Sequence, residues 1–375
     1  MKIPQSMKAL VGNRSIITRL SNYARSNSSG DGVKISTIPI PTIEEQEILV
    51  RVHSVALNPT DFKHIDILSP RGAIIGCDYA GTVAKVGSNV TGWTVGDRVA
   101  GVTHGGLYTD RGSFAEYLKI PGDLAWKVPS SISDEQAATF GVSAVTAMLA
   151  LNTRLGVPWV EGGENKDGHK DEDEDEERSK TPILIYSGAT SAGLYAIQLA
   201  KLGGLKVVVT ASPRSHDLVK EYGADDVFDY RSSTAVEEII RAYPSLDRAM
   251  DCFSEGESTA FCADVVRKNK GSVVTLLDSG KTEWDGVKVD FLLAYTAMGA
   301  EFQWLPPFGP KFGKAPSDRE ALRRFYASLP GTSKILRPPP LQVIEGGLEG
   351  LRTGLDLLRQ GKVSGTKLVA RLISK

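Results

Sequence analysis

The sequence predicts an α/β protein with a doubly wound parallel sheet and a second, β-rich domain. Short apolar segments such as 183–186 and 206–210 each precede a helix-like segment and show no apolar/polar alternation, as expected for strands buried on both faces of a parallel sheet. The first third of the chain instead carries loosely alternating strands and closely spaced glycines, which favour an antiparallel, barrel-like domain. A chain of 375 residues is long enough for two such domains.

The expected elements follow in chain order. A strand covers 47–56, tight turns use the glycines at 76, 81, 87, 92, 96 and 101, and one helix runs from Ser133 to Leu149, starting with a Ser133–Gln136 capping box. The parallel sheet takes strands at 183–186, 206–210, 225–228, 248–251 and 272–277, with helices at 192–202, 216–222, 236–242 and 258–266. Prolines at 306–307 and 338–340 interrupt the tail, which ends in an amphipathic helix with leucines at 348, 351, 355 and 358 and a strand at 367–372.

The composition excludes several functional classes. A net charge of -1 disfavours a nucleic-acid binder, three cysteines cannot form a four-cysteine zinc site, and no apolar run reaches the ~18 residues of a membrane span. The N-terminus lacks an apolar signal core, so we expect a cytoplasmic protein. Residues 161–178 hold ten acidic and three basic residues and predict a solvated loop without a specific role. The rest of the chain has 35 acidic and 41 basic residues, a balance that could favour a phosphate-bearing cofactor.

The segment Ser187–Gly193 lies where a dinucleotide-binding fold places its phosphate-binding turn, between a strand and a helix. Its small residues let a pyrophosphate approach the backbone. The full G-x-G-x-x-G spacing is absent, since only Gly188 and Gly193 are present, and no Gly-Lys-Ser/Thr follows. Taken alone, the turn is equally consistent with tight strand–helix packing.

The end of the next strand strengthens the case for a cofactor. It reads Thr210-Ala211-Ser212-Pro213-Arg214, with no carboxylate for the ribose hydroxyls of NAD. A hydroxyl and a guanidinium suit the 2′-phosphate of NADPH, and Tyr222 adds a hydroxyl or a stacking face. The alternative is an ordinary surface arginine at a helix start, where a positive charge opposes the helix dipole.

Several motifs together carry a family resemblance. Residues 76–83, 86–87, 96–99 and 112–117, with the 187–193 turn, resemble the medium-chain dehydrogenase/reductase signature. Residues 58–64, 139–147, 212–214 and 361–369 make the chain similar to the fungal trans-acting enoyl reductases of highly reducing polyketide synthases. The resemblance covers nearly the whole chain. It implies a GroES-like catalytic domain (1–145), a Rossmann NADP-binding domain (146–305) with the acidic loop 161–180, and a C-terminal segment (306–375) returning to the catalytic domain.

The same resemblance bears on metal use. Zinc-dependent members carry Cys where Asn58 falls and His where Cys77 falls, so we expect no catalytic metal here. The five histidines show no ligand spacing, and a metal site built from His64 and Cys77 remains a minor alternative. Otherwise Cys77 is expected to be an inert buried thiol.

The resemblance also assigns site residues. Lys63 is the expected catalytic residue, because its ammonium can bind ribose hydroxyls and favour an enolate. Cofactor contacts are implied for Thr60, Asp61, Phe62, Lys63, Ala189, Thr190, Ser191, Ala192, Gly193, Ser212, Pro213, Arg214, Ser215, Tyr222, Leu276, Leu277, Val363 and Ser364. The implied acyl pocket is Thr139, Phe140, Gly141, Val142, Ser143, Ala144, Val145 and Thr146, although a close helix–helix contact explains that stretch equally well. Tyr79 and Tyr117 are weaker candidates for a proton donor, and Phe302, Trp304 and Phe308 line the channel or belong to the core.

The expected activity is NADPH-dependent reduction of the α,β-double bond of an enoyl thioester carried by another protein. The partner would be the carrier domain of a highly reducing polyketide synthase or synthase–peptide synthetase hybrid, and the resemblance implies a monomer. Two alternatives stay open: a free-standing NADPH quinone or enone reductase, and a protein that binds NADPH without turnover.

Overall fold

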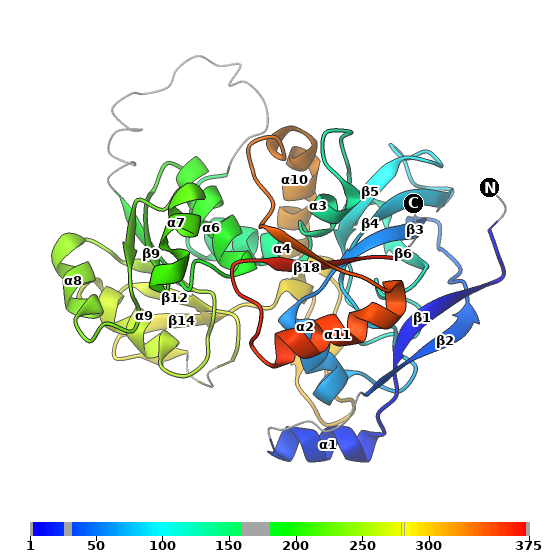
Figure 1. Ribbon diagram of the computed structural model, residues 1–375, viewed down its shortest axis with the longest axis horizontal. Coiled ribbons are helices and arrows are strands. Elements are labelled where there is room, and N and C mark those ends of the chain that lie inside the picture. Colours follow the sequence, from blue (N-terminus) through cyan, green and yellow to red (C-terminus); the bar gives the residue numbers. More distant parts are fainter. Residues whose placement is uncertain (1–2, 26–31, 160–180, 279, 281, 373–375) are drawn as a thin grey trace. The chain divides into compact units, whose positions relative to one another are not determined.

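A computed structural model describes residues 3–25, 32–159, 181–278, 280 and 282–372, shown in Figure 1. The acidic segment 161–178, for which a solvated loop was expected, lies outside the described residues. The chain divides into two compact units. Unit 1 comprises Met1–Val142, Tyr295–Pro330 and Pro340–Lys375, and unit 2 comprises Ser143–Ala294 and Gly331–Pro339.

Unit 2 contains the predicted doubly wound sheet. Its strands are β8 (Pro182–Tyr186), β9 (Lys206–Thr210), β10 (Asp226–Phe228), β11 (Arg248–Asp251), β12 (Ser272–Thr275), β13 (Glu283–Trp284) and β14 (Val287–Phe291). They lie in the order β10-β9-β8-β11-β12-β14-β13, and all pairs are parallel except β13–β14. The six parallel strands thus follow the order 3-2-1-4-5-6. This order reverses between β8 and β11, and a ligand is expected at the carboxyl ends of these two strands.

Helices connect the strands of unit 2. They are α6 (Ser191–Leu202), α7 (His216–Glu221), α8 (Ala235–Ala242) and α9 (Ser258–Val266), with 3₁₀ turns η4 (Pro213–Ser215) and η5 (Arg267–Asn269). Ile239 of α8 and Cys262 of α9 belong to one apolar cluster with strand residues Leu184, Val208 and Val273. Both helices therefore pack on the same face of the sheet. Right-handed crossovers place α6 and α7 on the other face.

Unit 1 is built on a mainly antiparallel sheet. Its strands are β3 (Glu47–Ala56), β4 (Asp78–Val86), β5 (Arg98–Val102), β6 (Tyr117–Pro121), β7 (Ala125–Lys127), β17 (Leu341–Ile344) and β18 (Lys367–Arg371). The order is β17-β18-β3-β4-β5-β7, with β6 also paired to β3; only β17 and β18 are parallel. Two hairpins accompany the sheet: β1 (Ser6–Gly12) with β2 (Val33–Pro39), and β15 (Phe302–Gln303) with β16 (Lys311–Phe312).

The glycines of unit 1 follow the predicted turns only in part. Gly76, Gly92 and Gly96 have φ of 90°, 81° and 99°, the conformation that glycine adopts easily. Gly81 and Gly101 lie inside strands, so the turn assignment was wrong for both. A Cβ on Gly81 would come within 2.0 Å of the Arg51 carbonyl oxygen, and these two glycines instead allow a close approach of neighbouring groups.

Several helices match the expected elements only in part. α2 (Pro59–Lys63) continues into the π-helix η1 (His64–Leu68), and α11 (Gly347–Arg359) is the predicted amphipathic helix. The helix expected from Ser133 to Leu149 is instead two helices, α3 (Asp134–Ala138) and α4 (Val142–Met148), followed by the π-helix η3 (Leu149–Arg154). The predicted Ser133–Gln136 capping box is present. The single-helix prediction was wrong because 139–141 turns to bring Gly141 against the carboxylate of Asp78.

Other elements of unit 1 were not expected. They are α1 (Ile16–Arg25), α10 (Pro316–Thr332), and the 3₁₀ turns η2 (Gly122–Leu124) and η6 (Ala294–Met298). The flanking prolines obscured α10, although only Pro330 lies within it, close to its C-terminal end.

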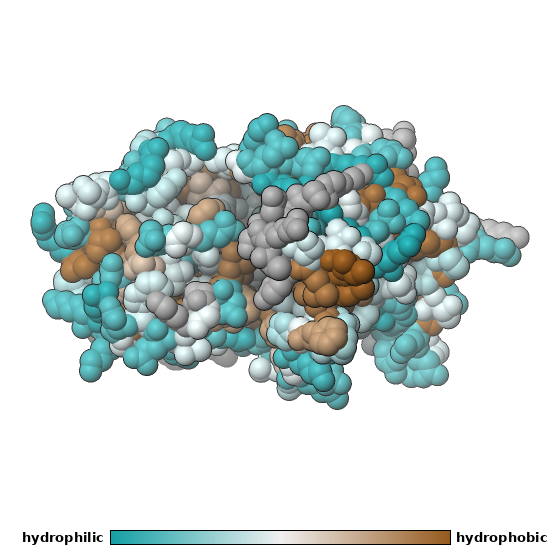
Figure 2. Space-filling view, turned by 90° about the horizontal axis from the view of Figure 1, so that it is seen from below, coloured by the Kyte–Doolittle hydropathy of each residue, from teal (hydrophilic) through white to brown (hydrophobic). Residues whose placement is uncertain are grey.

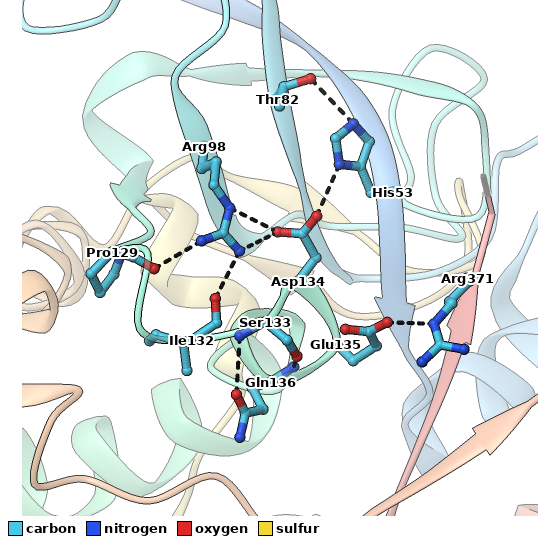
Figure 3. A network of polar contacts seen from close by, with 10 residues as sticks. All are labelled: His53, Thr82, Arg98, Pro129, Ile132, Ser133, Asp134, Glu135, Gln136 and Arg371. Carbon is cyan, nitrogen blue, oxygen red and sulfur yellow. Dashed lines mark hydrogen bonds and ion pairs between the residues drawn. The ribbon is translucent and has the colours of Figure 1, made fainter. Parts of the chain in front are cut away.

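A polar network fixes α3 against the sheet of unit 1 (Figure 3). The Asp134 carboxylate accepts from Arg98 Nη2 at 2.5 Å and lies 2.9 Å from His53 Nδ1. Glu135, the next residue, pairs with Arg371 of β18. Burial raises the pKa of Asp134, but the hydrogen bonds with His53 and Arg98 outweigh it and hold this pKa below its usual range. Because α3 is held from two sides, the interruption of the helix at 139–141, directly after α3, is held in place too.

Helix α1 lies at the edge of unit 1 and leaves apolar side chains in solvent. Asn22 donates to the backbone oxygen of Asp66 at 2.7 Å and so attaches the helix to η1. On the other side Ile16, Ile17 and Leu20 are 40%, 78% and 38% exposed. Figure 2 shows the molecule from below, the side on which Figure 1 shows α1. Apolar residues interrupt the hydrophilic surface of the molecule on this side. No helix among the described residues is long and apolar enough to cross a bilayer.

Candidate active site

The predicted phosphate-binding turn follows β8 at the edge where the strand order reverses. Thr190 caps α6, because its Oγ1 accepts from the Gly193 amide at 3.0 Å. A Cβ on Gly193 would lie 2.6 Å from the Gly188 carbonyl oxygen, so this glycine lets the turn fold tightly on itself. Ala189, Thr190, Ser191 and Ala192 are half-buried at the start of the 12-residue helix, whose N-terminal end attracts an anion.

The end of β9 lies beside this turn in the same sheet. Residues Pro213–Ser215 form η4, and the Ser215 amide donates to the Ser212 carbonyl at 2.8 Å. Arg214 is exposed and makes no hydrogen bond or ion pair with any other described residue. Asp217 is the first carboxylate after β9 and lies on α7. The basic, hydroxyl-rich character expected for a 2′-phosphate site is thus present on one strand end.

Other residues expected to contact the cofactor form hydrogen bonds or ring contacts within their own unit. The Tyr222 hydroxyl donates to the Pro338 carbonyl at 2.6 Å, and the Arg337 guanidinium lies 4.6 Å from the Tyr222 ring centroid. The Leu276 amide donates to Ser254 Oγ at 2.8 Å, and the Leu276 and Leu277 side chains are half-buried beyond β12. These residues share unit 2 with the turn, whereas half-buried Val363 and exposed Ser364 lie in unit 1, between α11 and β18.

Helix α2 of unit 1 carries the expected residues Thr60 to Lys63. Asn58 caps it, and the Asn58 amide donates to Asp61 Oδ2 at 2.7 Å. Thr60 and Lys63 are half-buried and three residues apart, so they lie on one face of the helix. The Phe62 ring lies under the Arg359 guanidinium at 5.5 Å.

A fully buried charged cluster lies directly beneath α2. The Lys367 ammonium donates to Asn58 Oδ1, and Asn58 Nδ2 donates to Asp78 Oδ2 at 2.8 Å. Lys367 Nζ is also 3.5 Å from Asp78 Oδ2. Asn58, Asp61, Asp78 and Lys367 are each no more than 3% exposed. The sequence analysis missed this cluster, because Lys367 opens an otherwise ordinary strand and nothing local marks it as buried.

The expected acyl-pocket stretch 139–146 connects to the same cluster. The Val142 amide donates to Asp78 Oδ1 at 2.7 Å, so Asp78 joins this stretch to Asn58. The Thr139 hydroxyl donates to the Gln136 carbonyl at 2.7 Å, and the Phe140 ring packs at 5.4 Å from that of Trp126. All eight residues are buried except half-buried Val142. Much of this stretch therefore serves packing, as the alternative interpretation of the sequence, a close helix–helix contact, expected.

Comparison with known proteins identifies the family. Residues 44–130 match the alcohol dehydrogenase GroES-like domain, and residues 192–284 match the zinc-binding dehydrogenase family. Over 350 residues, the chain is 37% identical to the trans-enoyl reductase ACTTS2 of Alternaria alternata, covering 91% of this chain and 96% of that protein. The chain belongs to the trans-enoyl reductase family. This membership makes it an oxidoreductase of the medium-chain dehydrogenase/reductase fold.

Further similarities agree with this placement. The enoyl reductase component lovC of the lovastatin nonaketide synthase, from Aspergillus terreus, is 34% identical over 342 residues, 89% of this chain and 91% of that protein. A mycobacterial protein solved with NADPH has the same fold, with a TM-score of 0.67 and 17% identity over 97% of this chain and 99% of that one. The predicted enoyl reductase resemblance and the predicted fold class are thereby confirmed. The family uses nicotinamide dinucleotides as hydride carriers.

In this enoyl reductase, Asn58 and Cys77 stand where the resemblance implies zinc ligands in zinc-dependent members. Both side chains make other contacts. The oxygen and nitrogen of the Asn58 amide bind Lys367 and Asp78, and Cys77 Sγ lies 3.5 Å from the Tyr295 hydroxyl. Burial raises the pKa of Cys77 and lowers that of His64 to about 4. Among the described residues, no three His, Cys, Asp or Glu side chains are grouped as metal ligands.

The weaker candidates of the sequence analysis lie in different surroundings. Tyr79 is fully buried, and burial raises the pKa of its hydroxyl well above the usual value. Tyr117 is 5% exposed, on β6. The Phe302 and Trp304 rings lie 6.1 Å apart in an aromatic group with His104, Tyr295 and Phe312, whereas Phe308 is 82% exposed. The sequence analysis missed Tyr295, which no periodic pattern marks.

The buried Asp61 of this enoyl reductase should make its stability depend on pH. Burial raises the pKa of Asp61 to about 7, and the charge of Asp78 adds to the effect, although the Asn58 amide opposes it. An unfolded aspartate has a pKa of about 3.9, so the folded state binds the extra proton between about pH 4 and 7. Stability that Asp61 contributes at low pH is therefore lost as the pH rises through about 7.

The variant Asp61→Asn cannot titrate but keeps an oxygen to accept from the Asn58 amide. We expect its free energy of unfolding to fall less steeply than that of the wild type between about pH 4 and 7. Urea denaturation at several pH values measures both slopes. Identical slopes would show that Asp61 is already ionised throughout this range.

Proposed function

We propose that this chain is an NADPH-dependent reductase of enoyl thioesters carried by a separate highly reducing polyketide synthase or synthase–peptide synthetase hybrid. The family membership supports the reaction class, since the relatives are named as trans-enoyl reductases. The observation that supports NADPH is the exposed Arg214 with the hydroxyl of Ser212 beside it, after a strand that ends without a carboxylate. We further infer that the chain works as a monomer, as the sequence resemblance implies, and that it acts in the cytoplasm.

The residues of unit 2 fit a dinucleotide. The tight turn at Gly188 and Gly193 and the start of α6 suit a pyrophosphate, because the helix end is electropositive and the small side chains leave the backbone accessible. Ser212, Arg214 and Ser215 would surround the 2′-phosphate, with Leu276 and Leu277 beyond the neighbouring strand end. In unit 1, Thr60, Lys63, Val363 and Ser364 are the residues proposed to contact the cofactor.

The cofactor, when bound, supplies the hydride that adds to the β-carbon of the enoyl group, and the α-carbon takes a proton from a side chain or water. The protein's part is to orient the thioester and to stabilise the negative charge that develops at its carbonyl oxygen. Lys63 is suited to this role, since this half-buried residue carries an ammonium, a strong hydrogen-bond donor. The residues at 139–146 would shape the acyl site, with Asp78 holding the stretch in place.

We propose that this reduction needs no metal. At the position of a zinc ligand, Asn58 is hydrogen-bonded to the ammonium of Lys367, and a cation placed there would be repelled by that charge. Reduction of an activated double bond is also less dependent on a Lewis acid than alcohol oxidation.

The first test is NADPH consumption with a 2-enoyl-pantetheine thioester, with and without chelator, against a parallel assay with a quinone. Faster thioester reduction that survives chelation supports the proposal. Quinone reduction with an inert thioester would favour the free-standing quinone or enone reductase. If neither substrate reacts, a carrier-bound enoyl chain is supplied, and no turnover with it would leave only NADPH binding.

Replacing Arg214 with Ala should weaken NADPH binding selectively. Loss of a charge-assisted contact to the 2′-phosphate costs about 1–3 kcal/mol, or about 5- to 150-fold in Kd, while NADH binding should not change. Fluorescence titration measures both constants. Arg241→Ala, on the exposed face of α8, is the matched control and should bind both cofactors normally. Equal loss for NADPH and NADH in Arg214→Ala would rule out a 2′-phosphate contact.

A further inference from the structure

The hydroxyl of Tyr295 lies between Thr60 and Cys77 in unit 1. It is 2.7 Å from Thr60 Oγ1 and 3.5 Å from Cys77 Sγ. Tyr295 and Cys77 are 5% and 1% exposed, whereas Thr60 is half-buried. A line of three hydrogen-bonding groups therefore runs from the interior of unit 1 to a residue near its surface.

The ring of Tyr295 is held by aromatic neighbours. It stacks on His104 with 3.9 Å between ring centroids and 12° between planes, and Phe302 meets it edge-on at 6.3 Å. Burial lowers the pKa of His104 well below its usual value, so the stacked partner is a neutral ring. The Tyr295 ring is thus held on two sides by packing.

The line can be polarised in either direction, because each of its three groups can donate or accept. Burial raises the pKa of both Cys77 and Tyr295, so thiol and phenol keep their protons at neutral pH. Cys77, Tyr295 and Thr60 carry one donor proton each, and the two hydrogen bonds between them use two of the three. One proton is therefore left to donate to a group outside this line. When Cys77 donates to Tyr295 and Tyr295 donates to Thr60, the Thr60 hydroxyl proton is directed away from the interior. Each donor polarises the next and strengthens this outer hydrogen bond.

We propose that Tyr295 is a positioning residue, which fixes the Thr60 hydroxyl as a hydrogen-bond donor to the carbonyl oxygen where the enolate charge develops. The inference rests on the proposed enoyl thioester reduction. Thr60 and Lys63 share a face of α2, so a hydroxyl and an ammonium can serve the same oxygen. Such donors act most strongly when the charge is fully developed, so Tyr295 should influence kcat more than binding.

Tyr295→Phe tests the proposal, because it removes the hydroxyl and keeps the ring on His104. We expect kcat for the enoyl thioester to fall about 10- to 100-fold with the NADPH Kd unchanged. Thr60→Val should lower kcat at least as much, Thr60→Ser should restore it, and Tyr295→Phe should cause no further loss when added to Thr60→Val. Tyr243→Phe is the matched control: its hydroxyl binds Asp226 in unit 2, and kcat should not change.

Three results would overturn the proposal: wild-type kcat in Tyr295→Phe, independent effects of the two substitutions that multiply in the double variant, or a lowered Tm with equally weakened NADPH binding. The wild-type protein separates this failure from that of the proposed function. If it reduces the thioester and only the variants behave otherwise, the positioning role alone is wrong. If it does not reduce a carrier-bound enoyl chain, both proposals fail.

Discussion

Replacing Lys367 with Met should destabilise the protein by about 3–5 kcal/mol, the usual cost of removing one partner from a buried ion pair. The ammonium is 3% exposed and lies close to the Asn58 amide oxygen and the Asp78 carboxylate. Methionine fills nearly the same volume but leaves Asp78 without a counter-charge in a site that water cannot reach. Asp61, also fully buried, adds a second carboxyl group to the same region.

Urea denaturation of wild type and Lys367→Met measures this difference. Lys362→Met, at an exposed position of the same unit, is the matched control and should change stability by no more than about 0.5 kcal/mol. Adding Asp78→Asn to Lys367→Met should recover part of the loss, because the uncompensated carboxylate is then removed. A Lys367→Met protein as stable as the wild type would mean that the carboxyl groups are protonated and that the cluster holds no net charge.

The parallel sheet of unit 2 could be predicted because its signals are local. Each strand from β8 to β11 is a short segment without apolar/polar alternation and is followed by one helix, so these elements can be placed within a few residues. The capping box at Ser133 and the leucines of α11 are local signals as well. The predicted 133–149 helix failed for the opposite reason, since its interruption is caused by Asp78, about 60 residues earlier in the chain.

The site beneath α2 could not be predicted in this way. Asn58 and Asp78 are 20 residues apart, Tyr295 and Lys367 come from distant parts of the chain, and no local pattern shows that these four side chains meet. Hydropathy would place Lys367 and Asp61 on a surface, whereas both are buried. Each of the two residues supplies part of the charge compensation of the other. The family resemblance assigned roles to Thr60 and Lys63 but did not reveal the groups that hold them.

Replacing Gly141 with Ala should be among the most damaging single changes that add only one methyl group. A Cβ at this position would lie 2.2 Å from Asp78 Oδ1 and 2.4 Å from Asp78 Cγ, closer than non-bonded atoms can approach. The carboxylate would have to move, and it would lose the hydrogen bonds from the Val142 backbone amide and from the Asn58 side-chain amide together. Overpacking and a broken buried hydrogen-bond network together should cost about 3–5 kcal/mol.

The measurement is again urea denaturation, with Gly313→Ala as the control, since a Cβ at Gly313 meets nothing within 4 Å. The two variants add the same methyl group to a glycine of the same unit, so any difference between them comes from Asp78. Gly141→Ala should also lower reductase activity in whatever fraction stays folded, because Asp78 joins the 139–146 stretch to the residue that caps α2. Equal stability of the two variants would mean that Asp78 can move without cost, and its role in coupling these segments would have to be abandoned.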